Sequence, residues 1–413
     1  MMHSLPGSRA ARMLRWPVVS AAVAVGAVVA LAAGASGSAR PGPELGGAPG
    51  AARGGPAVAG ARALTWSVVP SPNRGSSYND LYGVSCVSAA DCVAVGTYEG
   101  STGPFQTLIE SWNGTRWSLV PSPNVGTGIN QLSGVACVSA ADCTAVGYGS
   151  GGLQTLIESW NGTSWSVVPS PSPGTGSNQL ASVSCVSAAD CTAVGGTGTK
   201  TLVESWNGTS WSVVPSPNRA GSNALQDVSC VPAPAVSCAA VGLNDSASGK
   251  RRTTLIESWN GTSWSVVPSP NWGGTGRSAL SGVSCVSAAD CMAVGESVSL
   301  KRLATLIEAW NGTRWSVVPS PTRGNVGGGL GGVSCVSAAD CTAAGVFEQV
   351  GFHTIIEAWN GTSWSVVPSP NLSDVSNFGA MSCVPSAGCT AVGSTSSPGH
   401  GDKTLIESGP ASG

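Results

Sequence analysis

Short apolar segments recur along this chain from Leu64 to Ser408, separated by turns rich in Gly, Ser, Asn and Pro. Each recurring unit contains L-x-x-V-S-C, D-C-T-A-V-G, T-L-I-E-S-W and W-S-V-V-P-S-P in that order, with N-G-T between the last two. Such segments predict four short β-strands per unit, which we name A to D, and Asn-Gly predicts a tight hairpin between strands C and D. In the first complete unit we expect the strands at Gly83–Val87, Cys92–Gly96, Thr107–Trp112 and Trp117–Pro121.

The first cysteine of each unit defines the period of the repeat. It recurs at intervals of 45 to 55 residues, and a period of about 40 to 50 residues is typical of a four-stranded propeller blade. Strand C carries adjacent apolar residues such as Leu108 and Ile109, which suits a sheet packed between two neighbours. The sequence therefore predicts an all-β fold, a seven-bladed β-propeller of four-stranded antiparallel blades.

The two ends of the repeat region are complementary. The region begins with Trp66–Pro70, a strand D without a strand C before it, and ends with Thr404–Ser408, a strand C without a strand D after it. Pairing of these N- and C-terminal strands would close the ring and remove the exposed sheet edges that favour aggregation. We therefore expect one propeller domain at residues 64–409, followed by a short tail at 410–413.

The residues before the repeats differ from them in composition. Three arginines precede an uncharged stretch of mostly Ala and Val from Trp16 to Ala39, as in a secretory signal peptide. The apolar stretch is also long enough for an uncleaved anchor. We expect residues 1–39 to be a signal peptide or signal anchor, and residues 40–63, rich in Pro, Gly and Ala, to be a flexible tether. The protein is then secreted, or held at a membrane where the leader stays uncleaved.

Charge is scarce throughout the chain. Charged residues make up 10% of the sequence and the net charge is −2, so no basic field attracts nucleic acid. The abundance of Gly, Pro and Trp beside little Lys or Glu favours strands and turns over long helices. We expect a monomer without a nucleic-acid partner.

The 14 cysteines lie two to a unit, one on each side of the turn between strands A and B. Paired strands bring such Cβ atoms within disulfide range, and exported chains with an even number of cysteines commonly use them this way. Zinc ligation and redox catalysis are the alternatives, but the spacings typical of either are absent. We expect seven disulfides within the blades, and neither a metal nor another cofactor. The pairs are Cys86–Cys92, Cys137–Cys143, Cys185–Cys191, Cys230–Cys238, Cys285–Cys291, Cys335–Cys341 and Cys383–Cys389.

A glutamate stands near the end of strand C in every unit. Seven carboxylates in register would suit a ring of cation sites, but a residue repeated in every blade more often serves the blade itself, for instance by accepting backbone or Trp N–H bonds. We favour the structural role. The residues are Glu110, Glu158, Glu204, Glu257, Glu308, Glu357 and Glu407.

Two further polar residues recur in the turns. An aspartate precedes the second cysteine in five units, and we expect it to bond its own backbone. The Asn of N-G-T is a turn residue first, although the same three residues form a glycosylation acceptor in a eukaryotic secretory pathway.

The connections between strands divide into constant and variable ones. The A–B turns and C–D hairpins are nearly the same in every unit, whereas the B–C and D–A connections vary in length and content. In an up-and-down blade the first two lie on one face of the disc, here named the constant face, and the other two on the opposite, variable face. Function concentrates in variable loops on a rigid scaffold, so we expect the ligand site on the variable face.

Basic and aromatic residues gather in the variable connections of the fourth and fifth units. An exposed Trp can stack on a sugar ring while Arg or Lys holds an anionic group. The alternative is that these charges only keep the disc soluble. The candidate ligand-binding residues are Lys250, Arg251, Arg252, Trp272, Arg277, Lys301 and Arg302. Aromatic residues also crowd the first blade, at Tyr78, Tyr82, Tyr98 and Phe105.

The order V-G, an apolar strand ending in an aromatic residue, a polar turn, Trp and a V-P-S-P tail resembles the kelch repeat. That repeat has a Gly doublet, an aromatic–Asp turn, a Trp and an L-P-x-M-P tail. The resemblance covers residues 64 to 408 in all seven units. It departs in its usually single Gly, its Trp–Asn at the turn and its added cysteine pair. The resemblance implies a kelch-like propeller, a fold also found in galactose oxidase that serves both binding and catalysis.

The sequence offers little for catalysis. Only His353 and His400 follow the tether, and no G-x-S-x-G, H-E-x-x-H or phosphate loop is present. A copper site like that of galactose oxidase would need Tyr and His together, whereas all four tyrosines lie in the first two blades. We expect an extracellular binding or adhesion module for a glycan or protein ligand, with anionic carbohydrate favoured. A structural cell-surface repeat protein and a propeller glycan hydrolase or lyase are the alternatives.

Overall fold

In a computed structural model of the chain, the described residues are 65–411 except 76, 101–102, 151–153, 233–235, 272–276, 300–301, 322–326, 350, 371–374 and 398–400. Every regular element among these residues is a β-strand. No helix in this part of the chain is long and apolar enough to cross a membrane. The expected leader at 1–39 and tether at 40–63 lie outside the described residues.

Four strands per repeat follow the predicted order, and we number the repeats 1 to 7 by their strands A. Strands A are β2 (Tyr78–Ser88), β6 (Gln131–Ser139), β10 (Asn178–Ser187), β14 (Ser222–Val231), β18 (Arg277–Ser287), β22 (Gly328–Ser337) and β26 (Val375–Val384). Strands B are β3 (Asp91–Glu99), β7 (Asp142–Gly149), β11 (Asp190–Thr197), β15 (Ser237–Asp245), β19 (Asp290–Ser299), β23 (Asp340–Glu348) and β27 (Gly388–Ser396). Strands C are β4 (Phe105–Trp112), β8 (Gln154–Trp160), β12 (Lys200–Trp206), β16 (Arg252–Trp259), β20 (Arg302–Trp310), β24 (Phe352–Trp359) and β28 (Lys403–Gly409). Strands D are β5 (Trp117–Val120), β9 (Trp165–Val167), β13 (Trp211–Val213), β17 (Trp264–Val267), β21 (Trp315–Val317), β25 (Trp364–Val367) and, for repeat 7, β1 (Ser67–Val68).

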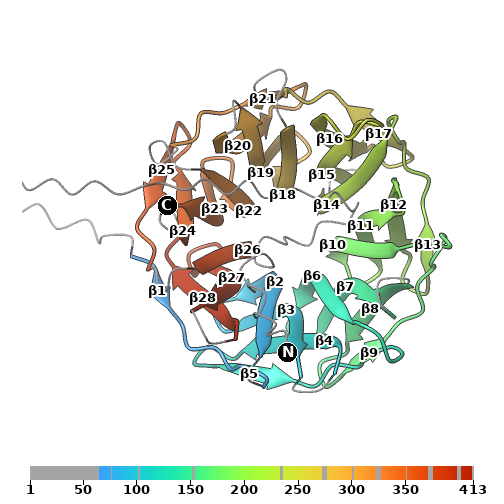
Figure 1. Cartoon of the computed structure of the whole chain (residues 1–413), viewed down its shortest axis with the longest axis vertical. Helices are drawn as coiled ribbons and strands as arrows, with labels where there is room; N and C mark the ends of the chain where they lie inside the picture. The colour runs from blue at the N-terminus through green and yellow to red at the C-terminus, as the bar shows by residue number, and fades with distance from the viewer. Residues whose placement is uncertain are drawn as a thin grey trace, which may run out of the picture. The chain divides into compact units, whose positions relative to one another are not determined.

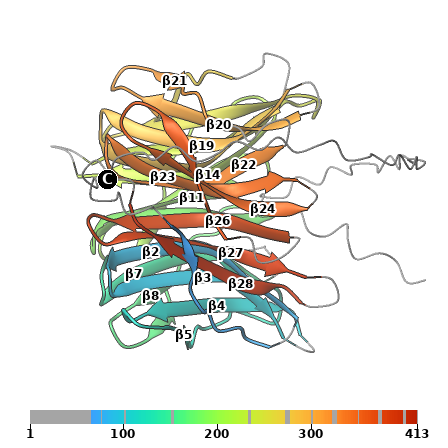
Figure 2. The same cartoon turned by 90° about the vertical axis from the view of Figure 1, so that its left-hand side faces the viewer.

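The strands of each repeat form an antiparallel sheet in the order A-B-C-D. Repeats 1 to 5 form separate four-stranded sheets, while repeats 6 and 7 share one sheet through a single bridge between Phe352 and Val375. Figure 1 shows strands A nearest the centre and strands D at the outer edge. Figure 2 shows the strands running between two opposite faces. This is the arrangement of a β-propeller, as predicted.

The first and last strands of the described chain pair with each other. β1 runs antiparallel to β28, with Ser67 opposite Ser408 and Val68 opposite Glu407. Gly409 stands where the other repeats have Trp at the end of strand C, and a Cβ there would meet the ring of Trp66 at 2.6 Å. The outer part of repeat 7 is therefore built from both ends of the chain, as their complementary sequences predict.

The core lies between neighbouring sheets. Leu108 and Ile109 are each 1% exposed, yet they belong to different clusters. Leu108 packs with Ile406 of repeat 7, and Ile109 packs with Leu132 of repeat 2. Adjacent apolar residues of strand C thus face opposite neighbours, which explains why this strand lacks alternation.

The glycine of A-V-G is required by the close approach of strands A and B. A Cβ on Gly96 would lie 1.9 Å from the carbonyl oxygen of Asp80. The equivalent glycine of every other repeat would make the same clash at 1.9 to 2.1 Å. Opposite this glycine, strand A has a β-bulge, which falls at Tyr82 in repeat 1.

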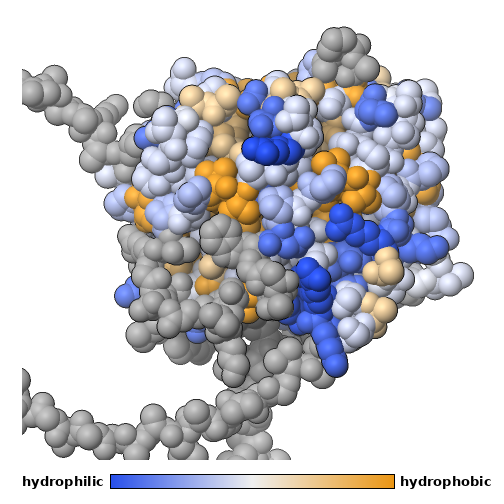
Figure 3. All heavy atoms as spheres, turned by 90° about the horizontal axis from the view of Figure 1, so that it is seen from above, coloured by the Kyte–Doolittle hydropathy of each residue, from blue (hydrophilic) through white to orange (hydrophobic). Residues whose placement is uncertain are grey.

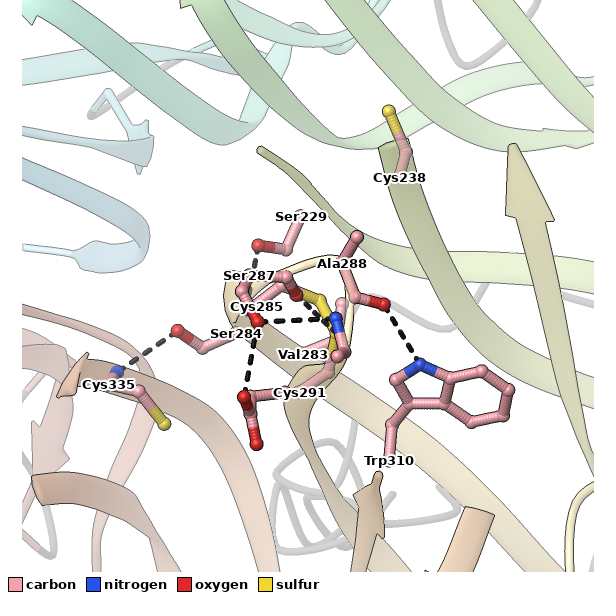
Figure 4. Close-up of a disulfide and its surroundings, with 12 residues drawn as sticks. Ser229, Cys238, Val283, Ser284, Cys285, Ser287, Ala288, Cys291, Trp310 and Cys335 are labelled. Atoms are coloured by element: carbon pink, nitrogen blue, oxygen red, sulfur yellow. Dashed lines mark hydrogen bonds between the residues drawn. A yellow bond between two sulfur atoms is a disulfide. The ribbon is translucent and has the colours of Figure 1, made fainter. Parts of the chain in front are cut away.

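Disulfides hold the end of each sheet at the constant face, and in five repeats an indole contact adds to them. Seven disulfides join strand A to strand B within one repeat, with Cα atoms 4.0 Å apart, and every pair is the one predicted. In Figure 4 the indole of Trp310 donates to the carbonyl of Ala288 in the A–B turn at 3.1 Å. Four other repeats make the same bond at 3.0 to 3.2 Å.

The recurring turn residues have definite partners. Asn113 Oδ1 accepts bonds from the amide and hydroxyl of Thr115 and from the amide of Arg116, at 2.8 to 3.1 Å. Asp91 differs from the expectation. Its Oδ2 accepts from the hydroxyl of Ser88 at 2.6 Å, and it is this serine that caps the amide of Ala90. The aspartate therefore orients the capping serine and does not bond its own backbone.

Candidate functional site

The seven strand-C glutamates are fully buried, each 0% exposed. Each accepts a hydrogen bond at 2.6 to 3.1 Å from the V-P-S-P serine of the preceding repeat. The same serine oxygen lies 2.6 to 2.8 Å from a strand-C threonine of its own repeat. Ser71 makes these contacts with Thr404 of repeat 7 and Glu110 of repeat 1. The glutamates join neighbouring sheets through a serine hydroxyl, whereas the sequence suggested backbone or Trp N–H donors.

Burial raises the pKa of all seven carboxyls, and the serine hydroxyl only partly offsets it. The pKa is about 7 for Glu204, Glu257, Glu357 and Glu407, and about 8 for Glu110, Glu158 and Glu308. In four of them the second oxygen is buried without a hydrogen-bond partner in the described structure, namely Glu110, Glu204, Glu257 and Glu407. Such an environment favours the protonated acid. No set of three His, Cys, Asp or Glu suited to a metal ion occurs among the described residues.

A second serine joins strands A of neighbouring repeats. In Figure 4, Ser229 accepts from the amide of Cys285 and Ser284 accepts from the amide of Cys335, each at 3.0 Å. The same bond recurs at four further junctions, including the junction of repeats 7 and 1. Repeat 2 has Ala136 at this position and offers no hydroxyl to the next strand.

The predicted basic site is partly neutralised by acidic residues. Arg252 donates from Nε and Nη2 to the two oxygens of Asp245 at 2.9 and 2.8 Å. Arg277 of the next repeat lies 3.7 Å from the same carboxylate. Burial raises the pKa of Glu296, while Arg252 and Arg277 act to lower it. The structure therefore joins repeats 4 and 5 through a mixed cluster of charges, in which two of the candidate ligand-binding arginines face acidic residues.

The other candidate ligand residues are distributed unevenly. Lys250 and Arg251 are exposed in the connection between β15 and β16. Arg252, Arg277 and Arg302 are the first residues of strands and do not lie in loops. Trp272 and Lys301 lie outside the described residues, as does the side chain of Arg302.

The aromatic residues of repeat 1 form two groups. The hydroxyls of Tyr78 and Tyr82 lie 3.1 Å apart, and Tyr148 of repeat 2 acts electrostatically on Tyr82. Tyr98 packs elsewhere, beneath the guanidinium of Arg74 at 4.9 Å. The sequence drew attention to the tyrosines of the first blade, but it gave no signal that Tyr148 would join them.

No contact between a histidine and a tyrosine is present among the described residues. His353 belongs to β24 in repeat 6, where its Nε2 lies 2.9 Å from the carbonyl of Gln349. His400 lies outside the described residues.

Two small cavities open between repeats at the constant face, which the sequence did not suggest. A cavity of about 190 Å³ lies between repeats 4 and 5, and one of about 100 Å³ between repeats 1 and 2. Their linings are equivalent, with Trp310 and Trp315 in the first where Trp160 and Trp165 stand in the second. They are formed by the same residues that hold each sheet end together, so the repeat itself accounts for them.

Apolar residues also reach the surface. In the view of Figure 3, hydrophobic residues lie in small groups between polar ones. The large hydrophobic side chains that are most exposed among the described residues are Leu119, Ile129, Val138, Val167 and Val213, at 36 to 44%. Scattered exposure of this kind is normal for a soluble domain and does not define a site.

Comparison with known proteins identifies the fold. No protein-family model and no curated protein sequence matches the chain. The solved structure of YCF48 bound to D1 peptide is similar, with a TM-score of 0.52 and 13% identity over 84% of this chain and 96% of that chain. U3-55K gives a TM-score of 0.55 and 9% identity over 84% and 98%. A GH74 xyloglucanase from Xanthomonas campestris gives 0.51 and 12% over 80% and 53%. At these identities the likeness shows the β-propeller fold alone.

Proposed function

We propose that this chain is an exported, closed seven-bladed β-propeller with a kelch-like repeat, which binds an extracellular ligand through its variable face. One observation carries the proposal. The repeats keep the same contacts at the constant face, whereas both described ion pairs and the half-buried pair Tyr78 and Tyr82 lie toward the variable ends of the strands. Where the side chains differ from repeat to repeat at one face only, that face can vary without loss of the fold and is available for recognition.

Closure of the ring is supported by contacts between repeats 7 and 1. Ser71 bridges Thr404 and Glu110, as the equivalent serine does at every other junction. The amide of Cys86 bonds Ser382 as the amides of other first cysteines bond the preceding repeat. The junction of the chain ends thus has the chemistry of an ordinary junction.

Export is supported by the disulfides. All 14 cysteines are paired within their repeats. Such bridges persist in oxidising compartments and are rare in a reducing cytosol. The leader-like composition of residues 1–39 agrees with this compartment.

Anionic carbohydrate is the ligand class that the variable connections of repeats 4 and 5 favour. Lys250 and Arg251 are exposed there, and the Arg277 side chain is 40% exposed although it faces Asp245. Trp272 lies in the same region of the sequence, where an indole would stack on a sugar ring. Acidic groups of the glycan would bind the two exposed cations, and Arg252 would hold the connection in place.

The proposal is tested by screening the full chain on a glycan array and measuring the affinity of the best acidic glycan. Trp272→Ala and the pair Lys250→Ala with Arg251→Ala should each weaken binding about tenfold or more, and the affinity should fall with added salt. Lys200→Ala is the matched control, because Lys200 is also an exposed lysine at the variable face, at the start of β12 in repeat 3. Equal binding by all these variants, or no acidic glycan bound at all, would contradict the proposal.

A further inference from the structure

An aromatic and acidic group lies at the variable end of strand A in repeat 1, away from the basic connections of repeats 4 and 5. Tyr78 and Tyr82 of β2 bring their hydroxyls to 3.1 Å from each other. The hydroxyl of Tyr78 also donates to Oδ2 of Asp80 at 3.0 Å. The ring of Tyr78 packs edge-on against Phe105, with ring centroids 5.1 Å apart. These contacts fix the ring and the carboxylate in one arrangement.

Asp80 is the least satisfied member of this group. Its side chain is 8% exposed, and Oδ1 is buried without a hydrogen-bond partner in the described structure. Burial raises the pKa of Asp80 to about 7, an effect that Tyr78 and Ser394 reduce. A buried carboxylate with free lone pairs is costly unless a donor reaches it. The side chains of Tyr78 and Tyr82 beside it are half-buried.

A second carboxylate stands beside Asp80. The main-chain oxygen of Asp402 accepts from the amide of Asn79 at 3.0 Å, which holds this part of repeat 7 against β2. The charge of Asp402 contributes to the raised pKa of Asp80. Neither acid forms an ion pair with a described residue, whereas Asp245 in repeat 4 has two arginines. The acidic pair therefore has no ion-pair partner among the described residues, unlike Asp245.

We propose that Tyr78, Asp80, Tyr82 and Asp402, named here the Asp80 cluster, bind an organic ammonium group of the kind carried by a lysine side chain or an amino sugar. An ammonium has three N–H donors, enough for the carboxylates of the cluster and a tyrosine hydroxyl; a bond to Oδ1 of Asp80 requires the surrounding side chains to move aside, because that oxygen is buried. Its charge offsets the repulsion between the two carboxylates, and the tyrosine rings add cation–π attraction. A metal ion is the weaker fit, because the described residues hold no third ligand of the His, Cys, Asp and Glu set.

Calorimetric titration of the full chain tests the inference directly. The probes are N-acetyl-lysine amide and glucosamine, with N-acetyl-norleucine amide and N-acetylglucosamine as uncharged controls. At pH 7, where both amines are mostly protonated, at least one ammonium probe should bind and both controls should not. Binding should weaken toward pH 5 as Asp80 takes up its proton, since burial keeps the pKa values of Tyr78 and Tyr82 above the ordinary value for tyrosine. The stronger probe tells a peptide ligand from an amino sugar.

Three variants decide where the probe binds. Asp80→Asn keeps the shape of the side chain and should weaken binding about tenfold or more, because the charge-assisted bond is lost. Tyr78→Phe should weaken it less. Asp91→Asn, at the opposite face, is the matched control and should bind like the native chain. Folding of each variant is checked by its melting temperature.

The outcomes separate this inference from the proposed glycan site. Equal binding of charged and uncharged probes, no binding of either ammonium probe, or unchanged binding by folded Asp80→Asn would overturn it. If Asp80→Asn does not fold, the pH profile of the native chain and the Tyr78→Phe variant still decide the question. Loss of acidic-glycan binding in the Lys250 and Arg251 variants leaves these results unaffected, because those residues belong to repeat 4.

Discussion

The constant and the variable face of this propeller are built from the same strands but are constrained differently. At the constant face, Trp160 and Trp310 each bond an alanine carbonyl of the A–B turn, and Asn113 and Asn161 each organise their hairpin with the same three bonds. At the variable face, Arg252 bonds Asp245 in one repeat and Tyr78 bonds Asp80 in another. The contacts that recur from repeat to repeat in this chain are therefore those that the fold itself requires.

Residues that recur in every repeat and residues that occur in only one repeat carry different information about function. A residue such as Glu308 recurs because every junction needs the same buried hydrogen bond, so its recurrence is poor evidence for a ligand. A residue such as Asp80 occurs once, at a position filled by Gln131 in repeat 2 and Gly329 in repeat 6. Where one position changes its chemistry around the scaffold, the fold does not dictate the side chain, so such positions are the candidates for recognition.

The largest effect should come from the buried glutamates at alkaline pH. Their pKa values of about 7 to 8 in the folded chain exceed the ordinary 4.5. A carboxyl whose pKa is raised in the folded chain contributes its full stabilisation below about pH 4.5, the ordinary pKa that it has in the unfolded chain. This contribution is lost as the pH rises through the pKa of the folded chain. A pKa that is higher by one in the folded than in the unfolded chain corresponds to about 1.4 kcal/mol. The free energy of unfolding should therefore fall clearly between pH 5 and pH 9, because all seven carboxyls act in the same direction.

Urea denaturation at a series of pH values measures this loss. Glu204→Gln removes one titrating group and keeps an acceptor for Ser170, so its stability should fall less steeply with pH than that of the native chain. Glu348→Gln is the control, because Glu348 is exposed at the end of β23. A native chain equally stable at pH 5 and pH 9 would show that the carboxyls find other donors.

The second prediction concerns the junction of the chain ends. Trp66 is 5% exposed and Trp165, its equivalent in repeat 2, is 7% exposed. Trp66→Ala should lower the free energy of unfolding by about 3 to 5 kcal/mol, the usual cost of emptying a buried aromatic site. Trp165→Ala should cost slightly more, because Trp165 also packs on Trp160 with ring centroids 5.7 Å apart, while Trp66 faces Gly409. If Trp66→Ala is nearly silent while Trp165→Ala is not, the ring is open in solution.

Strand order, disulfide pairing and the junction of the chain ends follow from local signals in the sequence. Cys86 and Cys92 flank one turn, and an unpaired strand at each end has only the other to complete it. The partner of Glu204 could not be read in this way. It is Ser170, 34 residues away in another repeat, and many serines are nearer in the chain. Local pattern determines each sheet, but contacts between sheets depend on how the repeats stack.

Contacts between repeats were even harder to predict from the sequence at the candidate site. The sequence grouped Arg252 with Arg277 as candidate ligand-binding residues because both lie in variable connections of adjacent repeats. In the structure they share Asp245, since the ends of β15, β16 and β18 meet. Charge balance between connections is a property of the assembled face, and a pattern along one chain does not contain it.

The third prediction uses the one junction without a strand-A serine. Ser85 accepts from the amide of Cys137 at 3.0 Å, so Ser85→Ala should lower the free energy of unfolding by about 1 kcal/mol. Ala136→Ser should supply the missing acceptor for the amide of Cys185 and raise the stability by a similar or smaller amount. Both are measured by urea denaturation at pH 6. A stabilising Ser85→Ala, or a destabilising Ala136→Ser, would mean that these amides are satisfied by other means.

The smallest effect is expected from a matched pair of neighbours on the variable face. Arg251 is exposed without an ion pair in the described structure, so Arg251→Ala should change the free energy of unfolding by less than about 0.5 kcal/mol. Arg252→Ala removes a bidentate bond to Asp245, whose side chain is 12% exposed, and should cost about 1 kcal/mol. Urea denaturation at low salt compares the two. Equal costs would mean that the Asp245 pair adds nothing to the fold, and that Arg252 is as free as Arg251 to bind a ligand.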